Sequence, residues 1–224
     1  MCAMNTRELT PLTPAQDFVY NAYRFGALEL LPNGRMTKSK RLSPYFFNSG
    51  LFCTGETMDF LATAYAAAIK PFSCEVVYGP PYKGIPLSTM IAMKVGGQMG
   101  SAWSRKEAKD HGEGGIMGGM SVKGKRTGLA DDVMTTGDSL RKGIELIRAF
   151  EGIPTCVAIS FDREELPDGG TMTAVQQFEQ DNGIPVAAAA KLSDLIDLIK
   201  QSNAQSFYPI LDKILEYKAQ YGAK

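Results

Sequence analysis

Segments with helical and with strand-like periodicity alternate along most of the chain. Apolar residues recur at helical spacing over about Thr57–Lys70, Ile85–Val95, Ser139–Phe150, Thr173–Asn182, Leu192–Ser202 and Phe207–Tyr221. Short apolar runs typical of buried strands lie at Glu75–Tyr78, Thr155–Phe161 and Val186–Ala190. Because strands that alternate with helices build a parallel sheet covered on both faces, the pattern predicts an α/β fold with a mainly parallel central sheet flanked by helices.

The N-terminal part of the chain shows a different pattern. Thr13-Pro14-Ala15-Gln16 has the composition of a capping box and predicts an amphipathic helix to about Ala27. Leu28–Leu31 follows as a short strand candidate, closed by the turn residues Pro32-Asn33-Gly34.

A basic patch then leads into an aromatic segment. Its cations are Lys38, Lys40 and Arg41, and the segment reads Ser43-Pro44-Tyr45-Phe46-Phe47-Asn48. Aromatic residues beside cations are typical of a packed strand with a solvated edge. The alternative is a flat aromatic wall with cations that binds an anionic ring.

Charge and composition exclude several classes of protein. Lys plus Arg equals Asp plus Glu at 24 each, so there is no net field to attract nucleic acid. No run of about 18 apolar residues indicates a membrane helix, and the N-terminus lacks the apolar stretch of a secretory signal. Cys2, Cys53, Cys74 and Cys156 show no CxxC spacing. We therefore expect a cytoplasmic protein with free thiols in a reducing compartment.

The stretch Gly128–Leu140 carries the strongest chemical signal. An apolar lead ends in the carboxylates of Asp131 and Asp132, and Thr135-Thr136-Gly137 then runs into the helix that begins near Ser139. Backbone N–H groups, hydroxyls and the helix dipole favour an anion at such a turn. The paired carboxylates suit sugar hydroxyls or a hydrated magnesium ion. The alternative is an acidic turn with a Thr/Gly helix cap.

Two further segments lie where a ligand would be expected. The turn with Lys83 and Gly84 follows the strand at Glu75–Tyr78, and ligands of α/β sheets bind beyond the carboxyl ends of strands. Arg163 follows the strand that ends at Phe161, and it would either form a surface salt bridge or pair with a carboxylate ligand.

Ser104–Gly119 is polar, rich in charge and rich in glycine. Arg105, Lys106, Lys109 and the chain's only histidine, His111, lie within this segment. Such a segment is commonly a solvated hairpin loop. The functional alternative is a lid with glycine hinges that carries cations over a polyphosphate and expels water.

Together these motifs carry a family resemblance. Asp131–Ser139, DDVMTTGDS, resembles the signature that binds 5-phosphoribosyl 1-diphosphate (PRPP) in type I phosphoribosyltransferases. Four further motifs resemble the orotate phosphoribosyltransferase family in particular: Lys38-Ser39-Lys40-Arg41, Ser43–Asn48, Pro81-Tyr82-Lys83-Gly84-Ile85-Pro86 and Arg105–Gly114. The resemblance spans about Lys38 to Arg163.

The resemblance implies one phosphoribosyltransferase domain over residues 1–224. Hood elements would come from about residues 1–50 and the C-terminal part, a core from about 55–190, and a flexible catalytic loop from about 104–119. The reaction implied converts PRPP and orotate to orotidine 5′-monophosphate and diphosphate, in the synthesis of UMP.

The resemblance also implies roles for single residues. Thr135, Thr136, Gly137, Asp138 and Ser139 would cradle the 5-phosphate of PRPP, and Asp131 and Asp132 would hold the ribose hydroxyls. The diphosphate would contact Lys83, Arg105, Lys106, Lys109 and His111. Lys38 would reach both substrates. Orotate would contact Phe46, Phe47, Thr135 and, through its carboxylate, Arg163. Lys109, His111, Asp131 and Asp132 would be catalytic.

A cofactor and partners follow from the same resemblance. Mg²⁺ would be held mainly by the diphosphate and the ribose hydroxyls, with Asp131 and Asp132 nearby. Family members are homodimers in which the catalytic loop closes over the neighbouring subunit's site. At 224 residues there is no room for a fused decarboxylase barrel, so the decarboxylase that acts on orotidine monophosphate would be a separate chain.

Three positions depart from the family pattern. The strand before Asp131, Arg126–Ala130, has weak strand propensity. Asp138 stands where a small hydroxyl residue is common and places an extra carboxylate beside the phosphate turn. Lys40 occupies a position commonly held by glycine.

Two rival functions remain. A nucleotide-sensing regulator of transcription would lack the lid cations or carry a basic extension for nucleic acid. The second is a phosphoribosyltransferase for another base. Phe46 and Phe47 with Arg163 favour a planar ring that bears a carboxylate, whereas an enzyme for purines would have no use for that arginine.

Overall fold

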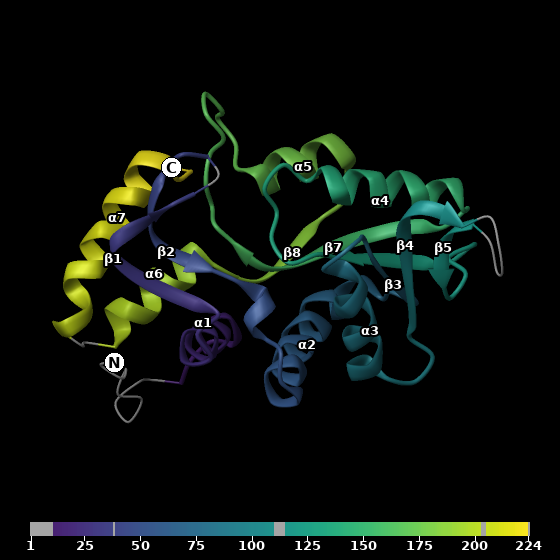
Figure 1. The fold of residues 1–224 in the computed structure, drawn as a ribbon, viewed down its shortest axis with the longest axis horizontal. Helices are drawn as coiled ribbons and strands as arrows, with labels where there is room; N and C mark the ends of the chain where they lie inside the picture. The colour runs from purple at the N-terminus through teal and green to yellow at the C-terminus, as the bar shows by residue number, and fades with distance from the viewer. Residues whose placement is uncertain (1–10, 38, 110–114, 203–204, 224) are drawn as a thin grey trace. The chain divides into compact units, whose positions relative to one another are not determined.

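The computed structural model describes residues 11–37, 39–109, 115–202 and 205–223 (Figure 1). These residues form two compact units. The first, which we call the terminal unit, draws on Met1–Cys53, Phe161–Thr173 and Ala190–Lys224. The second, which we call the sheet unit, consists of Thr54–Ser160 and Ala174–Ala189. Lys38 and His111 lie outside the described residues, and nothing is described of the side chain of Lys109.

A six-stranded sheet in the order β5-β4-β3-β6-β7-β8 organises the sheet unit. Its strands are β3 (Val76–Gly79), β4 (Gly100–Lys109), β5 (Gly115–Gly119), β6 (Arg126–Ala130), β7 (Ile153–Asp162) and β8 (Val186–Lys191), and the last residues of β7 and β8 belong to the terminal unit. β3 pairs in parallel with β4 and β6, β6 pairs in parallel with β7, and only β5 is antiparallel to its neighbour among the pairings described. The predicted α/β fold with a mainly parallel sheet is confirmed.

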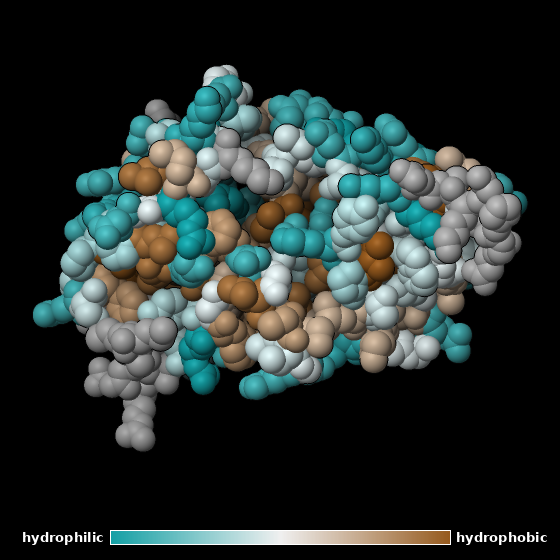
Figure 2. Space-filling view, viewed as in Figure 1, coloured by the Kyte–Doolittle hydropathy of each residue, from teal (hydrophilic) through white to brown (hydrophobic). Residues whose placement is uncertain are grey.

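Helices cover both faces of this sheet. In Figure 1, α4 (Asp138–Ala149) and α5 (Ala174–Asn182) lie on one face, and α2 (Gly55–Ile69) and α3 (Gly84–Val95) lie on the other. α4 turns Leu140, Ile144 and Ile147 into the core, and Figure 2 shows hydrophilic side chains over α4 and α5. The amphipathic pattern predicted for these helices therefore reflects a buried and a solvated face.

The core of the sheet unit is continuous and apolar. Tyr78, Leu129 and Val157 come from three adjacent strands and are 1%, 0% and 0% exposed. Strand β6 forms in spite of its weak propensity, because it is paired on both sides and its last four residues are buried. Tertiary pairing thus overrides local preference at this strand.

The terminal unit is built on a two-stranded antiparallel hairpin, β1 (Leu28–Met36) and β2 (Leu42–Phe47). Its helices are α1 (Pro14–Arg24), α6 (Leu192–Gln201) and α7 (Tyr208–Tyr221), with short 3-10 turns at Ser49–Leu51 and Gln205–Phe207; one more, Lys70–Phe72, follows α2 in the sheet unit. The capping box predicted at Thr13 is confirmed: Gln16 N donates to Thr13 Oγ1 at 3.1 Å, and Thr13 N donates to Gln16 Oε1 at 3.0 Å.

One prediction for this unit was wrong in detail. Pro32-Asn33-Gly34 does not close a strand but lies inside β1, where the pairing register shifts between Leu30 and Arg35. Gly34 adopts φ +69° there, which permits the irregularity. Lys40 keeps the left-handed conformation that favours glycine, with φ +59°, and its N–H donates to Thr37 O at 3.0 Å. The turn therefore survives the substitution, at a backbone cost of about 1 kcal/mol.

The segment Ser104–Gly119, expected as a loop, is largely strand where it is described. Residues 104–109 complete β4 and residues 115–119 form β5, paired to it. Among the described residues, no helix has both the length and the apolar character needed to cross a membrane.

Candidate functional site

Asp131 and Asp132 stand at the carboxyl edge of the parallel sheet. They follow β6, whose neighbours β3 and β7 run in the same direction. Ligands of open α/β sheets bind at this edge, where loops leave the strands. The sequence prediction that this pair lies at the end of a strand is confirmed.

Buried hydrogen bonds fix the backbone of the aspartate pair. The buried phenol of Tyr65 donates to Asp131 O at 2.7 Å. Ser160 donates to Asp132 O through its N–H at 2.9 Å and also through its hydroxyl. Sequence reasoning assigned Tyr65 only to the apolar face of a helix and gave Ser160 no role, because no local pattern marks a side chain that caps a distant strand.

Each of the two carboxylates accepts hydrogen bonds from neighbouring groups of the protein. Asp131 accepts from Asp132 N at 2.9 Å and from Ser139 Oγ at 2.8 Å. Burial raises the pKa of Asp131, and these hydrogen bonds oppose that rise. Asp132 accepts from Lys83 Nζ at 2.6 Å. Since the Lys83 side chain is 55% exposed, its ammonium is within reach of an incoming anion as well.

Lys83 is presented by a tight turn between β3 and α3. The turn brings Gly79 and Gly84 into contact: a Cβ at Gly79 would lie 1.9 Å from Gly84 O. Glycine is therefore required at position 79 for Lys83 to lie beside Asp132. The Gly/Pro-rich turn predicted here is confirmed, as is its position after a strand.

The turn predicted to hold a phosphate leads directly into α4. Gly137 is its N-cap residue and has φ +75°, which favours glycine. Asp138, the departure from the family pattern, accepts from Thr136 Oγ1 at 2.9 Å and from Arg141 Nη2 at 3.3 Å. The hydrogen bond from Thr136, followed by that from Arg141, lowers the pKa of Asp138. The negative charge of Asp138 is thus balanced by the guanidinium of Arg141, one helical turn along α4.

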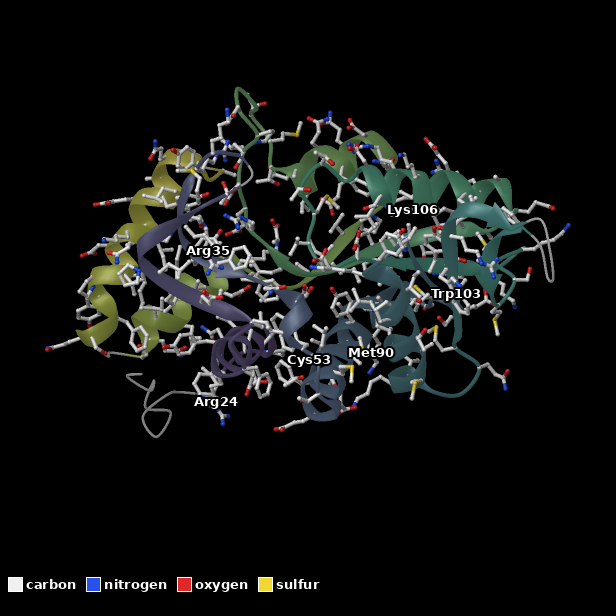
Figure 3. The ribbon with its side chains drawn as sticks, in the orientation of Figure 1. Arg24, Arg35, Cys53, Met90, Trp103 and Lys106 are labelled. Carbon is white, nitrogen blue, oxygen red and sulfur yellow. The ribbon has the colours of Figure 1, made fainter. Side chains whose placement is uncertain are left out.

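One cation of the predicted lid, Lys106, lies close to the turn that carries Lys83. Lys106 and Trp103 extend from β4 (Figure 3), and the Lys106 ammonium lies 4.5 Å from the ring centroid of Tyr82, the neighbour of Lys83. Arg105 donates to Gly115 O at 3.2 Å across the β4–β5 pair. The structure therefore brings Lys83 and Lys106 into one region of the sheet unit.

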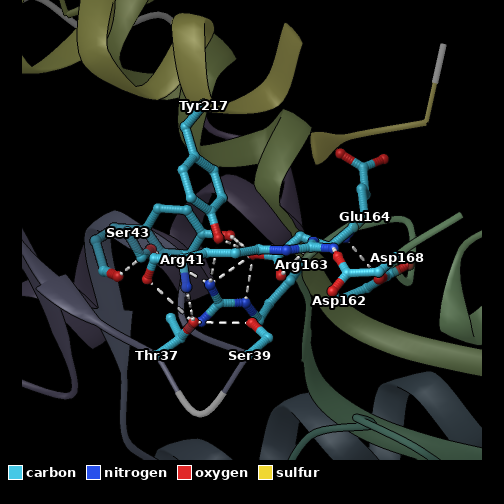
Figure 4. Close-up of polar contacts among 11 residues, drawn as sticks. Thr37, Ser39, Arg41, Ser43, Asp162, Arg163, Glu164, Asp168 and Tyr217 are labelled. Carbon is cyan, nitrogen blue, oxygen red and sulfur yellow. Dashed lines mark hydrogen bonds and ion pairs between the residues drawn. The ribbon is translucent and has the colours of Figure 1, made fainter. Parts of the chain in front are cut away.

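Arg163 lies in a polar cluster of the terminal unit, shown in Figure 4. It donates to Glu165 Oε1 through Nε at 2.8 Å and through Nη2 at 2.5 Å. Tyr217 donates to the same oxygen at 2.9 Å. Burial opposes the charge of Arg163, yet its surroundings, Glu165 among them, raise its pKa above the ordinary value. The salt bridge predicted for Arg163 forms, but it is partly buried rather than at the surface, with the Arg163 and Glu165 side chains 20% and 17% exposed. Glu165 engages Nε and Nη2 of the guanidinium.

Arg41 is the second arginine of this cluster and is 7% exposed, although the sequence suggested a solvated edge. It pairs with Asp168 and lies 3.7 Å from Glu165 Oε2. Its guanidinium stacks 4.6 Å from the ring centroid of Tyr221. Glu165 therefore bridges two arginines, a role that sequence reasoning missed because residues 41, 163 and 165 are brought together only by the fold.

The predicted aromatic pair points in two directions, as alternate residues of a strand do. Phe47 is 8% exposed and stacks on Phe161, with ring centroids 5.3 Å apart, so it belongs to the core of its unit. Phe46 is half-buried, and the guanidinium of Arg35 lies 4.4 Å from its ring centroid (Figure 3). Of the two rings, only Phe46 presents a face outside the core.

The chain resembles proteins of one named activity. It is 40% identical over 210 residues to an orotate phosphoribosyltransferase of Stenotrophomonas maltophilia, covering 91% of this chain and 92% of the relative. It is 40% identical over 220 residues to an orotate phosphoribosyltransferase of Bordetella avium, covering 93% and 98%. No protein-family model matches the chain.

Solved structures agree with this result. The crystal structure of orotate phosphoribosyltransferase from Francisella tularensis superposes with a TM-score of 0.80 at 30% identity, covering 92% of this chain and all of that one. The structure of Leishmania donovani UMP synthase matches with a TM-score of 0.73 at 19% identity, covering 92% of this chain and 42% of that one. At that identity the second match shows the fold alone.

Gly79→Ala tests the geometry of the Lys83 turn. The added methyl group would overlap the carbonyl of Gly84, so the turn must open, and we expect destabilisation of about 2 kcal/mol or more. Urea unfolding measures it, with Gly55→Ala as the control. Like Gly79, Gly55 has no positive φ, but a Cβ there meets nothing within 4 Å. Equal losses of unfolding free energy in both variants would show that the close contact between Gly79 and Gly84 does not make glycine necessary at position 79.

Proposed function

Because the chain belongs to the orotate phosphoribosyltransferase family, we propose a magnesium-dependent reaction in which the sheet unit binds PRPP and residues of the terminal unit bind orotate. The reaction transfers the phosphoribosyl group of PRPP to orotate and gives orotidine 5′-monophosphate and diphosphate. The assignment of PRPP to the sheet unit rests mainly on the turn from Asp131 to Ser139. There, two adjacent carboxylates lie beside the N-terminus of α4.

The PRPP half of the proposal rests on charge and hydrogen-bonding groups. The N-terminus of α4 and the hydroxyls of Thr135, Thr136 and Ser139 suit the 5-phosphate. Asp131 and Asp132 are acceptors for the ribose hydroxyls. Lys83 is held 2.6 Å from Asp132, so it can exchange this carboxylate for the diphosphate without a large movement. By family resemblance, Arg105, Lys106, Lys109 and His111 complete the contacts to the diphosphate, and Lys38 contacts both substrates.

Magnesium fits this half of the site through its donor chemistry. The described residues hold no group of three or more His, Cys, Asp or Glu side chains that could bind a metal ion by themselves. Mg²⁺ keeps several waters and binds phosphates together with one or two carboxylates. Asp131 and Asp132 fit that requirement, with most ligands coming from PRPP. When bound, the ion would neutralise negative charge on the diphosphate.

The orotate half of the proposal rests on Arg163 and Phe46. Glu165 accepts from Nε and Nη2 of Arg163, and Nη2 also donates to Tyr217 Oη at 3.4 Å, so this edge of the guanidinium is held and its plane is fixed. We propose that the carboxylate of orotate pairs with the remaining donors. Phe46 offers a ring face for the planar pyrimidine, whereas Phe47 supports the strand from the core.

Catalysis would come mainly from electrostatics. Cleavage at the anomeric carbon leaves positive charge on the ribose and negative charge on the departing diphosphate. Lysine and arginine side chains placed at the diphosphate stabilise the negative charge on it. Orotate is already anionic, so little base catalysis is needed. Closure of the β4–β5 hairpin would exclude water that otherwise hydrolyses PRPP. By resemblance, we propose a homodimer in which each hairpin closes over the neighbouring site.

A competition assay tests the proposed substrates and the cofactor together. Orotate consumption in the presence of PRPP is followed spectrophotometrically, either with MgCl₂ or with excess EDTA. Uracil, adenine and hypoxanthine are tested as alternative bases. We expect the protein to use orotate and none of the three other bases. The turnover should be lost in excess EDTA and restored by added Mg²⁺. Turnover of a different base without orotate turnover would overthrow the base assignment, and full activity in EDTA would overthrow the magnesium requirement.

Arg163→Lys tests the orotate contact. A lysine keeps the charge but lacks the planar fork, so we expect the KM for orotate to rise about tenfold or more, because a charge-assisted pair contributes about 1.5–3 kcal/mol. The KM for PRPP should change by less than about threefold. Arg24→Lys is the control, since Arg24 stacks on Tyr20 at the surface of α1. An unchanged KM for orotate in Arg163→Lys would remove this residue from the site.

A further inference from the structure

Two cysteine side chains meet over a glycine inside the sheet unit. Cys74 precedes β3 and Cys156 lies in β7, and β6 runs between these two strands. Their Sγ atoms are 3.7 Å apart. Gly128 of β6 pairs with Cys156, and a Cβ at Gly128 would lie 2.8 Å from Cys74 Sγ and 3.3 Å from Cys156 Sγ. The two sulfur atoms therefore occupy the space that a side chain at position 128 would need.

The members of this thiol pair differ in accessibility. Cys156 is 0% exposed, whereas Cys74 is half-buried. Cys74 also lines a pocket of about 360 Å³. The charged residues of its lining are Glu75 and Lys125, and the others are Val95, Gly96, Gln98, Met99 and Met120. A small reagent can thus reach Cys74, but Cys156 is shielded behind it.

The surroundings of Cys74 favour its thiolate. The hydrogen bond with the Cys156 thiol lowers the pKa of Cys74, in opposition to burial, and Thr155 and the Arg126 guanidinium add to this effect. Thr155 Oγ1 lies 3.3 Å from Cys74 Sγ. The hydrogen bond with Cys74 and burial both raise the pKa of Cys156, so this thiol is the one of the two that keeps its proton. Reactive cysteines are partly exposed thiols in electropositive surroundings of this kind.

We propose that Cys74 is a modification site that exchanges with low-molecular-weight disulfides, and that Cys156 activates it by donating a hydrogen bond to its thiolate. In the exchange, Cys74 Sγ attacks one sulfur of the reagent and forms a mixed disulfide. The S–S bond of the reagent breaks, and the other half leaves as a thiolate that takes a proton from water. The pocket beside Cys74 has space for the added group, and the Lys125 ammonium there suits a carboxylate on it, as in glutathione.

The pH dependence of the rate identifies the mechanism. A thiol with a lowered pKa remains a reactive thiolate at pH values where an ordinary thiol, of pKa near 8.5, is protonated. Its thiolate is also less basic and therefore less nucleophilic, so the ordinary thiol reacts faster at high pH. A single rate at neutral pH would therefore miss the activation.

The experiment measures the rate of reaction with glutathione disulfide from pH 5 to pH 9, by intact mass of the full chain and peptide mapping. On the peptide that carries Cys74 we expect one glutathionyl group, with a rate midpoint at least about one pH unit below the pKa near 8.5 of an ordinary thiol. In Cys156→Ala the midpoint should move to about pH 8–9, so that its profile crosses that of the native chain. Cys53→Ser should leave the rate profile of Cys74 unchanged, because Cys53 is a separate exposed cysteine that is followed on its own peptide.

Gly128→Ala provides an independent variant that keeps both thiols. Its methyl group would separate the sulfur atoms, and we expect the same shift of the midpoint as in Cys156→Ala. Orotate turnover of the unmodified variants, within about twofold of the native chain, shows that they are folded. A native midpoint at pH 8–9, equal modification in Cys74→Ser, or an unshifted midpoint in both folded variants would each overturn the proposal.

Discussion

The hydrogen bonds that hold the carbonyl groups of Asp131 and Asp132 are the constraint on which the site depends. Tyr65 holds one carbonyl from α2, and Ser160 holds the other from β7. A buried polar group that loses its partner costs about 1–3 kcal/mol, so a shift of β6 against its neighbours would break several such bonds at once. The carboxylates are therefore presented at fixed positions, where Lys83 and Ser139 meet them. The phosphate turn and α4 follow within a few residues, so their positions depend on the same anchor.

The charged residues proposed to contact PRPP in one unit and orotate in the other are each paired within their own unit before any substrate binds. Lys83 pairs with Asp132 in the sheet unit, and Arg163 pairs with Glu165 in the terminal unit. Such pairing keeps flexible charged side chains close to the orientation that a ligand needs, which reduces the entropy lost on binding. Asp138 follows the same principle, since Thr136 and Arg141 engage its carboxylate beside the phosphate turn. The extra negative charge is thereby compensated locally.

Sequence reasoning succeeded where local pattern decides the outcome. The α/β alternation, the capping box at Thr13 and the strand-turn-helix order around Asp131 depend on neighbours in the chain, and all were confirmed. It failed where distant segments decide. The bulge at Gly34 depends on pairing with β2, β6 forms because both its edges are paired, and Phe46 and Phe47 differ only because one face of β2 is core. The partnerships of Tyr65, Glu165 and the thiol pair leave no mark in local sequence, because each joins residues from separate elements.

Calorimetric titration with PRPP in excess Mg²⁺ tests most directly whether the anchored carboxylates organise the site. We expect Asp131→Asn and Asp132→Asn each to weaken PRPP binding by about tenfold to a hundredfold, because each replaces a charged acceptor worth about 1.5–3 kcal/mol. Binding within about twofold of the native chain in both variants would contradict this expectation, since the carboxylates would then have no part in holding PRPP.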